Sequence, residues 1–167
     1  MPINFAEKPT TITNHTFLMA EGRWTLQGHW LLQPNGPVIP VAGKLMVVWQ
    51  SETWFTLVGK IVPIQSQLPD DVTSPPSITL QYRGHIGVSE QQFTFMLQHS
   101  HLGQIEGQGW ILPNSIVKRF WILGDADGRT GIEHFCCIDS NRYTWSSSLM
   151  AGPTLLSTLE AQLVQHK

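Results

Sequence analysis

The chain has 167 residues and a net charge of −2, with 41% hydrophobic and 13% charged residues. This length suits one domain, which we expect to span residues 1–167. The ten basic residues are scattered, so the chain lacks the basic patch that binding to nucleic acid requires. No stretch approaches the roughly 20 apolar residues of a membrane-spanning helix.

The first 21 residues predict an irregular lead-in to the fold. Met1–Thr13 contains Pro, Asn, Glu and Lys and lacks the apolar run of a secretory signal, so we expect a cytoplasmic protein. We expect Asn14 to cap a short helical turn through Phe17, Leu18 and Met19, which ends at Gly22.

From residue 22 onward, short runs of β-branched and aromatic residues alternate with turn residues such as Pro34-Asn35-Gly36. Each run is typical of a strand. The expected strands cover residues 23–33, 38–50, 54–64, 77–86, 91–99, 104–112, 115–123, 131–139 and 142–149. Many short strands joined by tight turns predict an all-β fold, a single antiparallel up-and-down meander closed into a barrel of about 8–10 strands. Closure is favoured because it removes both exposed sheet edges.

The C-terminal stretch fits two structures. Leu155, Leu156, Leu159 and Leu163 fit a helical stripe, while Leu155, Leu159, Ala161 and Leu163 fit one face of a strand. Gly152-Pro153 supplies a hairpin-like turn just before this stretch. We therefore favour a last strand that pairs with the first and closes the barrel.

The two cysteines, Cys136 and Cys137, are neighbours in the sequence. In a strand their side chains point to opposite faces, so we expect no disulfide between them. We interpret them as small packing residues in a reducing compartment.

Gly22-Arg23-Trp24, at the start of the first expected strand of this meander, resembles a motif of the calycin group of lipocalin-like and fatty-acid-binding-like barrels. The resemblance implies that Trp24 plugs the closed end and that an arginine of a late strand, Arg119 or Arg142, packs over its ring. Without a signal peptide or a disulfide pair, the chain is more similar to the intracellular members of this group. These include fatty-acid carriers, haem-binding nitrobindin-like proteins and bilin lyases, so the resemblance implies haem or a linear tetrapyrrole as candidate ligands.

Several aromatic residues are expected to face the barrel interior. A small closed barrel either fills its interior with side chains or holds one small ligand. We predict a ligand cavity and the binding of a small apolar or amphipathic molecule, driven mainly by burial of apolar surface. The expected ligand-binding residues are Trp30, Tyr82, Phe93, Phe95, Phe120, His134 and Trp145.

Glu133 and His134 are consecutive in the middle of an expected strand, so one of them should face the interior. A lone ionisable group there is costly unless it is paired. The inward residue either orients a ligand or belongs to a hydrogen-bond network that closes the barrel end. As the only plausible general acid or base, it is also the candidate catalytic residue of an alternative function, a cofactor-free isomerase, cyclase or chromophore lyase.

Two further hypotheses concern metal binding and assembly. His99 and His101 share a strand face, but the sequence offers no third ligand, so we expect no metal site. Val117, Trp121 and Leu123 are expected on the outer face of their strand, where they favour a homodimer. This outer face also supports a third alternative, an interaction protein whose barrel interior is filled.

Overall fold

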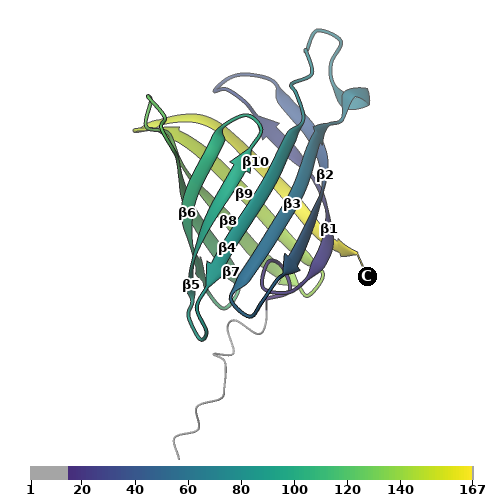
Figure 1. The fold of residues 1–167 in the computed structure, drawn as a ribbon. Coiled ribbons are helices and arrows are strands. Elements are labelled where there is room, and N and C mark those ends of the chain that lie inside the picture. Colours follow the sequence, from purple (N-terminus) through teal and green to yellow (C-terminus); the bar gives the residue numbers. More distant parts are fainter. Residues whose placement is uncertain (1–14, 167) are drawn as a thin grey trace, which may run out of the picture.

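The computed structural model describes residues 15–166, which form ten antiparallel strands and one short 3₁₀ helix, η1 (Gln65–Gln67) (Figure 1). The strands are β1 (Gly22–Leu31), β2 (Val38–Trp49), β3 (Trp54–Pro63), β4 (Ile78–Ile86), β5 (Gln92–His99), β6 (Gly103–Ile111), β7 (Ser115–Ile122), β8 (Thr130–Asp139), β9 (Arg142–Ala151) and β10 (Thr154–His166). The predicted meander is confirmed. No helix among these residues is long and apolar enough to cross a membrane.

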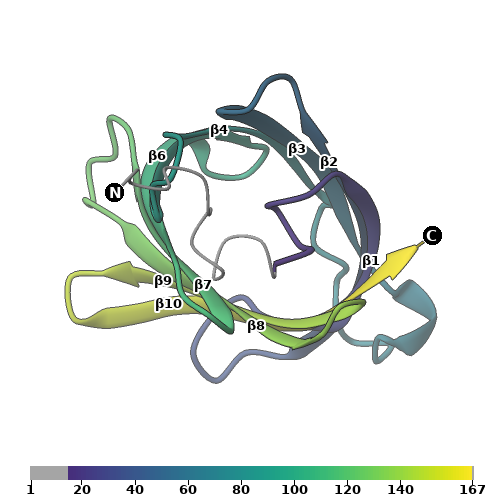
Figure 2. The same ribbon diagram turned by 90° about the horizontal axis from the view of Figure 1, so that it is seen from below.

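The sheet closes on itself. Each strand pairs with the next in the chain, and β10 pairs with β1, so the strands form the ring that Figure 2 shows end-on. The ambiguous C-terminal stretch is therefore a strand. In the closing pair Trp30 lies opposite Leu159 and Leu26 lies opposite Leu163, and all four side chains are buried.

Alternation along each strand separates the barrel interior from its outer surface. In β5, Phe93, Phe95 and Leu97 are buried, while the intervening Thr94 and Met96 are exposed. This period of two is what a sheet with one buried face requires. The interior is thus lined by one residue in two from every strand.

Phenylalanines on the inner face lie opposite glycines of the neighbouring strand. The pairs in register are Phe55 and Gly84, Phe93 and Gly109, Phe95 and Gly107, and Phe120 and Gly131. A Cβ atom added to any of these glycines would overlap the partner's ring. A glycine in a strand often marks a place where another group comes close to the backbone. Here that group is a phenylalanine ring of the neighbouring strand.

One end of the barrel, here called the base, is closed by residues 15–20, which Figure 2 shows inside the ring of strands. His15 is buried, with Nδ1 2.8 Å from the Tyr143 hydroxyl and Nε2 2.7 Å from the carbonyl oxygen of Leu112. Because the carbonyl only accepts, Nε2 donates to it and Nδ1 accepts from the hydroxyl. These bonds fix the lead-in to the β6–β7 and β8–β9 ends of the wall.

The helical turn predicted before β1 is wrong in its geometry. Met19 N–H donates to the carbonyl of Phe17 at 2.7 Å, and Leu18 has a φ of 66°, so the segment makes a tight non-helical turn. The turn places Phe17 and Leu18 in the core. Asn14, the predicted cap, lies outside the described residues.

Trp24 is almost fully buried at the base, but the arginine expected over its ring is absent among the described residues. Arg119 is exposed, and Arg142 is exposed and pairs with Asp139 at 2.8 Å. Both arginines occupy outward positions of their strands. The ring of Trp24 instead meets Phe17 and Tyr143 edge-on, at centroid distances of 5.3 and 5.6 Å. Phe17 of the lead-in and Tyr143 therefore contact the Trp24 ring, where the family resemblance implies an arginine.

Candidate functional site: a cavity inside the barrel

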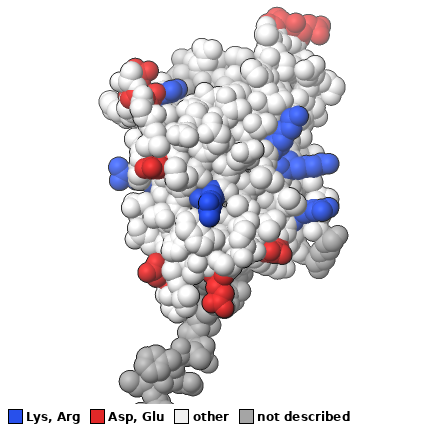
Figure 3. Space-filling model, viewed as in Figure 1, with Lys and Arg blue, Asp and Glu red and all other residues white. Residues whose placement is uncertain are grey.

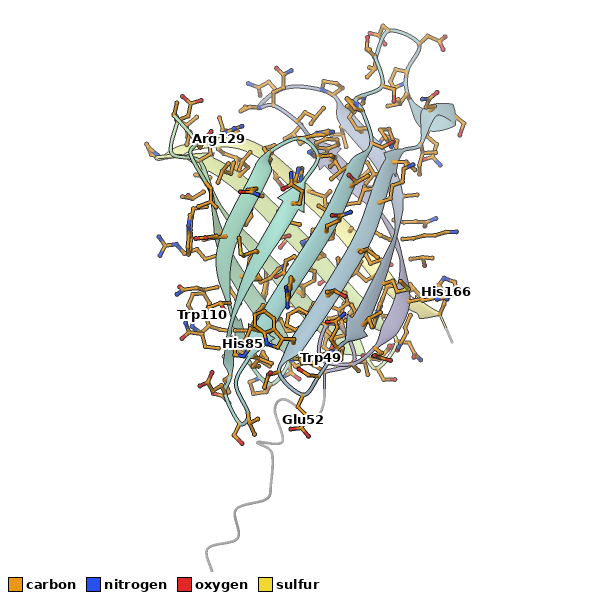
Figure 4. All side chains as sticks on the ribbon, in the orientation of Figure 1. Trp49, Glu52, His85, Trp110, Arg129 and His166 are labelled. Carbon is orange, nitrogen blue, oxygen red and sulfur yellow. The ribbon has the colours of Figure 1, made fainter. Side chains whose placement is uncertain are left out.

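The barrel interior contains a cavity of about 310 Å³. Phe17 of the lead-in forms its floor, and Leu32, His101, Leu102 and Arg129 mark its opposite end, here called the rim. Figure 4 shows Arg129 at this end, far from Trp49 and Glu52 at the base. The apolar lining between floor and rim includes Trp30, Leu45, Leu57, Ile61, Ile78, Leu80, Leu97, Ile105, Phe120, Phe135, Trp145, Leu149 and Leu159.

A buried ion pair lies in this apolar lining. Lys118 and Glu133 are only 5% and 6% exposed, and Lys118 Nζ is 3.2 Å from Glu133 Oε1. The other carboxylate oxygen, Oε2, accepts a hydrogen bond of 2.7 Å from Trp145 Nε1. The two charges therefore neutralise each other inside the wall, which limits the cost of burying them.

Aromatic rings surround the Lys118 ammonium. Its Nζ is 4.4 Å from the ring centroid of Tyr82, 5.1 Å from that of Phe95 and 4.9 Å from that of Phe135. Such contacts attract a cation. Burial lowers the pKa of Lys118 from its ordinary value, and the charge and hydrogen bond of Glu133 oppose this shift.

The Tyr82 hydroxyl is buried beside the ion pair and has no hydrogen-bond partner within residues 15–166. Its ring stacks on Phe95 at a centroid distance of 4.6 Å. Burial raises the pKa of Tyr82 well above its ordinary value, and the carboxylate of Glu133 raises it further. Tyr82 therefore presents a neutral O–H group that a ligand can use as a donor.

His99 lines the cavity near the rim in a defined tautomer. Its Nδ1 accepts hydrogen bonds from the backbone N–H groups of His101 and Leu102, at 3.0 and 3.2 Å. Burial, with a smaller contribution from the charge of His101, lowers the pKa of His99 to about 4. The ring is therefore neutral at pH 7, with its proton on Nε2. Among residues 15–166 no cluster of three or more His, Cys, Asp or Glu residues is arranged to hold a metal ion.

The structure brings four of the predicted ligand-binding residues to the cavity. Trp30, Tyr82, Phe120 and Trp145 line it.

Phe93 and Phe95 are buried in the core but do not line the cavity. Their rings lie over Gly109 and Gly107 of the neighbouring strand, and this packing holds them against the wall.

Glu133, and not His134, faces the interior. His134, predicted as a ligand-binding or catalytic residue, lies on the outer side of β8 and does not line the cavity; its Nε2 is 3.5 Å from Cys136 Sγ. Both cysteines are free. The alternation of β8 buries Gly131, Glu133 and Phe135 and turns His134 outward.

Sequence reasoning missed Lys118. The signal was its position between Ile116 and Phe120, which places it on the inner face of β7 by alternation. A lysine is almost never fully buried unless it is paired, so its residue type favours an outward position and opposes the signal from alternation. Other charged side chains are scattered over the outer surface, as one face shows in Figure 3.

No protein-family model and no curated protein matches this sequence. Among solved structures, the crystal structure of Rv2717c from M. tuberculosis is similar, with a TM-score of 0.62 and 14% sequence identity over 87% of this chain and 92% of that chain. The structure of EF1p2_mFAP2b bound to DFHBI covers the same shares, with a TM-score of 0.45 and 8% identity. The first likeness concerns the fold alone. The chain thus shares the closed antiparallel β-barrel fold.

Proposed function

We propose that this protein binds a small apolar or amphipathic molecule inside its barrel. The observation that carries the proposal is the cavity of about 310 Å³, whose lining is largely apolar. Its volume lies at the lower end of the range of about 300–1,000 Å³ found for ligand sites. The filled interior that an interaction protein would have is not what the structure shows.

The polar groups of the cavity favour a ligand without a formal charge. Glu133 already neutralises Lys118, so a ligand carboxylate placed beside them would add an unpaired buried charge. Among the described residues Tyr82 has a buried hydroxyl without a partner, and His99 carries its proton on Nε2. Both are donors, so the favoured ligand carries hydrogen-bond acceptors such as carbonyl or ether oxygens.

The second proposal is that the cavity binds haem or a linear tetrapyrrole, as the family resemblance implies. Both molecules are large, whereas the cavity volume of about 310 Å³ lies at the lower end of the range for ligand sites. Axial ligation of haem iron by His99 would also need Nε2 to lose its proton, while Nδ1 is held by two backbone donors. We therefore place small neutral molecules first and include both tetrapyrroles in the test.

Tryptophan fluorescence tests the proposal because Trp30 and Trp145 line the cavity. Titrations with naphthalene ketones and alcohols, fatty acids, haem and biliverdin should show saturable quenching, strongest for the neutral compounds. Absence of quenching by every class would contradict the proposal.

Ser147 and Ser148 provide a matched pair of variants. Ser147 lines the cavity next to Glu133 in register, whereas Ser148 lies opposite Ile132 on the outer side. Ser147→Phe fills part of the cavity and should weaken ligand binding about tenfold or more, a loss of about 1.4 kcal/mol. Ser148→Phe should leave affinity unchanged. Equal effects of the two variants would place the ligand elsewhere.

A further inference from the structure

The barrel holds one amine in a chemical setting unlike that of a surface lysine. Lys118 Nζ is buried among three aromatic rings, and Lys118 itself lines the cavity. The exposed lysines Lys44 and Lys60 lie on the outer face of β2 and β3, opposite each other in register. A buried lysine is a better nucleophile than an exposed one, because desolvation favours its neutral amine.

Two further groups stand where a carbonyl reaction needs them. Glu133 Oε1, 3.2 Å from Nζ, can carry protons from the nitrogen. The Tyr82 hydroxyl has no partner in the part of the chain that the structure describes, and the Tyr82 ring centroid lies 4.4 Å from Nζ, so this hydroxyl can donate to a carbonyl oxygen nearby. Trp145 Nε1–H holds the second carboxylate oxygen in place.

We propose that Lys118 forms a Schiff base with an apolar aldehyde bound in the cavity, with Glu133 as the counterion of the protonated imine. This inference rests on the proposed binding function and names the substrate class for the same cavity. The general reaction is known for lysines in apolar pockets.

The atoms and charges balance without any further reactant. Glu133 takes a proton from the Lys118 ammonium, and the amine then attacks the aldehyde carbon to form the C–N bond. The Tyr82 hydroxyl donates a hydrogen bond to the developing alkoxide oxygen. That oxygen leaves as water with two of the three ammonium protons, and the third stays on the imine nitrogen. The carboxylate of Glu133 again faces one positive charge.

Reductive trapping tests the proposal. The full-length protein is incubated with 2-naphthaldehyde and sodium cyanoborohydride, which reduces the imine to a stable secondary amine, and the labelled lysines are located by peptide mass spectrometry. Lys118 should gain the naphthylmethyl group about tenfold or more faster than Lys44 and Lys60, which serve as internal controls. Excess 2-naphthalenemethanol, which has the same shape but cannot form an imine, should protect Lys118 alone.

Tyr82→Phe separates chemistry from binding. It keeps the ring and removes the hydroxyl, so it should slow labelling of Lys118 by about tenfold or more. Labelling of Lys44 and Lys60 in this variant should be unchanged. Lys118→Met should remove the cavity label, and circular dichroism checks that each variant is folded.

The outcomes distinguish the two proposals. If 2-naphthalenemethanol quenches tryptophan fluorescence but Lys118 is labelled no faster than Lys44 and Lys60, the Schiff base is overturned and the binding function stands. If none of the titrated ligand classes quenches the fluorescence and Lys118 is not labelled preferentially, both proposals fail. Rapid labelling of Lys118 that the alcohol does not prevent would place the reaction outside the cavity and overturn the inference.

Discussion

At the scale of single residues, the buried pair of Lys118 and Glu133 is the most unusual feature of the molecule. Ion pairs in an apolar interior cost free energy to desolvate, and their mutual attraction recovers that cost only with good geometry. Here the 3.2 Å contact, the Trp145 hydrogen bond and the surrounding rings supply this geometry. These contacts offset part of the cost of burying the two charges.

Removing one partner of the pair should be worse than removing both charges. Lys118→Met leaves the Glu133 carboxylate buried without its cation, and we expect a loss of about 3–5 kcal/mol in the free energy of unfolding. Glu133→Gln added to this variant should restore most of the loss, because the amide oxygen can still accept from Trp145 Nε1. Urea denaturation measures all three proteins. Lys60→Met, at an exposed position, is the control and should change stability by less than about 0.5 kcal/mol. A double variant as unstable as Lys118→Met would contradict this account.

His99 should make stability depend on pH. Its pKa is about 4 in the folded protein against 6.5 for an ordinary histidine. Between these values the unfolded chain binds a proton that the folded protein does not, so stability falls as the pH drops from 6.5 to 4 and this contribution levels off below 4. At about 1.36 kcal/mol per pKa unit, the contribution is at most about 3.4 kcal/mol. Thermal unfolding of wild type and His99→Asn over pH 3.5–7.5 measures it as the difference between the two curves; parallel curves would rule it out.

At the scale of the elements, cross-strand Phe–Gly pairs shape the wall. Phe93 and Phe95 of β5 lie over Gly109 and Gly107 of β6, so the rings occupy space that side chains of β6 would otherwise fill. This arrangement lets large rings lie against the sheet without filling the centre of the barrel. It explains how an interior so rich in aromatic residues still contains a cavity.

Gly109→Ala should therefore be destabilising, because the added Cβ overlaps the Phe93 ring. We expect a loss of about 1–3 kcal/mol, as for other overpacked cores. In a Phe93→Leu background the same substitution should cost less, since the ring is gone, and a double-mutant cycle by chemical denaturation gives the coupling. Gln108→Ala, the next position on β6, is the control. Additive effects of Gly109→Ala and Phe93→Leu would mean that this contact does not constrain the wall.

The lead-in is the other element that sets the shape of the cavity. Its Phe17 forms the cavity floor, and His15 ties the segment to Leu112 and Tyr143 of the wall. Trp24 and Tyr143 pack around the same ring, at 5.3 and 5.6 Å from Phe17. The base is thus closed by an aromatic cluster from three separate parts of the chain.

At the scale of the whole molecule, the outer surface carries few charges and some apolar side chains. Val117 and Trp121 point outward from β7 and are half-buried, Leu123 follows them and is exposed, and Trp110 lies opposite Val117 in β6. These residues form what we call the outer patch. Surfaces of this kind mark contacts between subunits when they are large enough.

The homodimer prediction is tested on this outer patch. We expect a dimer in analytical ultracentrifugation, because pairing two copies of the patch would bury it. Trp121→Arg should convert the dimer to a monomer, since each interface would then bury unpaired charges. Trp54→Arg changes an exposed tryptophan on β3, away from the outer patch, and should leave the dimer intact. A wild-type protein that is monomeric at all concentrations would exclude the interface.

The sequence by itself determined the strands, the turns and the closed meander, because alternation of period two is a local property that each strand carries on its own. It also determined that Trp24 and most of the aromatic residues face inward. It left open whether Glu133 or His134 faces inward, because pairing with the neighbouring strands decides which of the two alternating faces of β8 turns toward the interior. Pairing with β7 and β9 placed Glu133 opposite Lys118 and Ser147 and so decided the question.

Only the tertiary structure decided the rest of the candidate site. The partnership of Lys118 with Glu133, the stacking of Phe93 and Phe95 on glycines, and the exclusion of Arg119 and Arg142 from Trp24 all join residues that are apart in the sequence. Such contacts follow from strand register and from the space left between side chains, neither of which a single segment encodes. The cavity itself is such a property, because it is the volume that inner side chains of all ten strands leave unfilled.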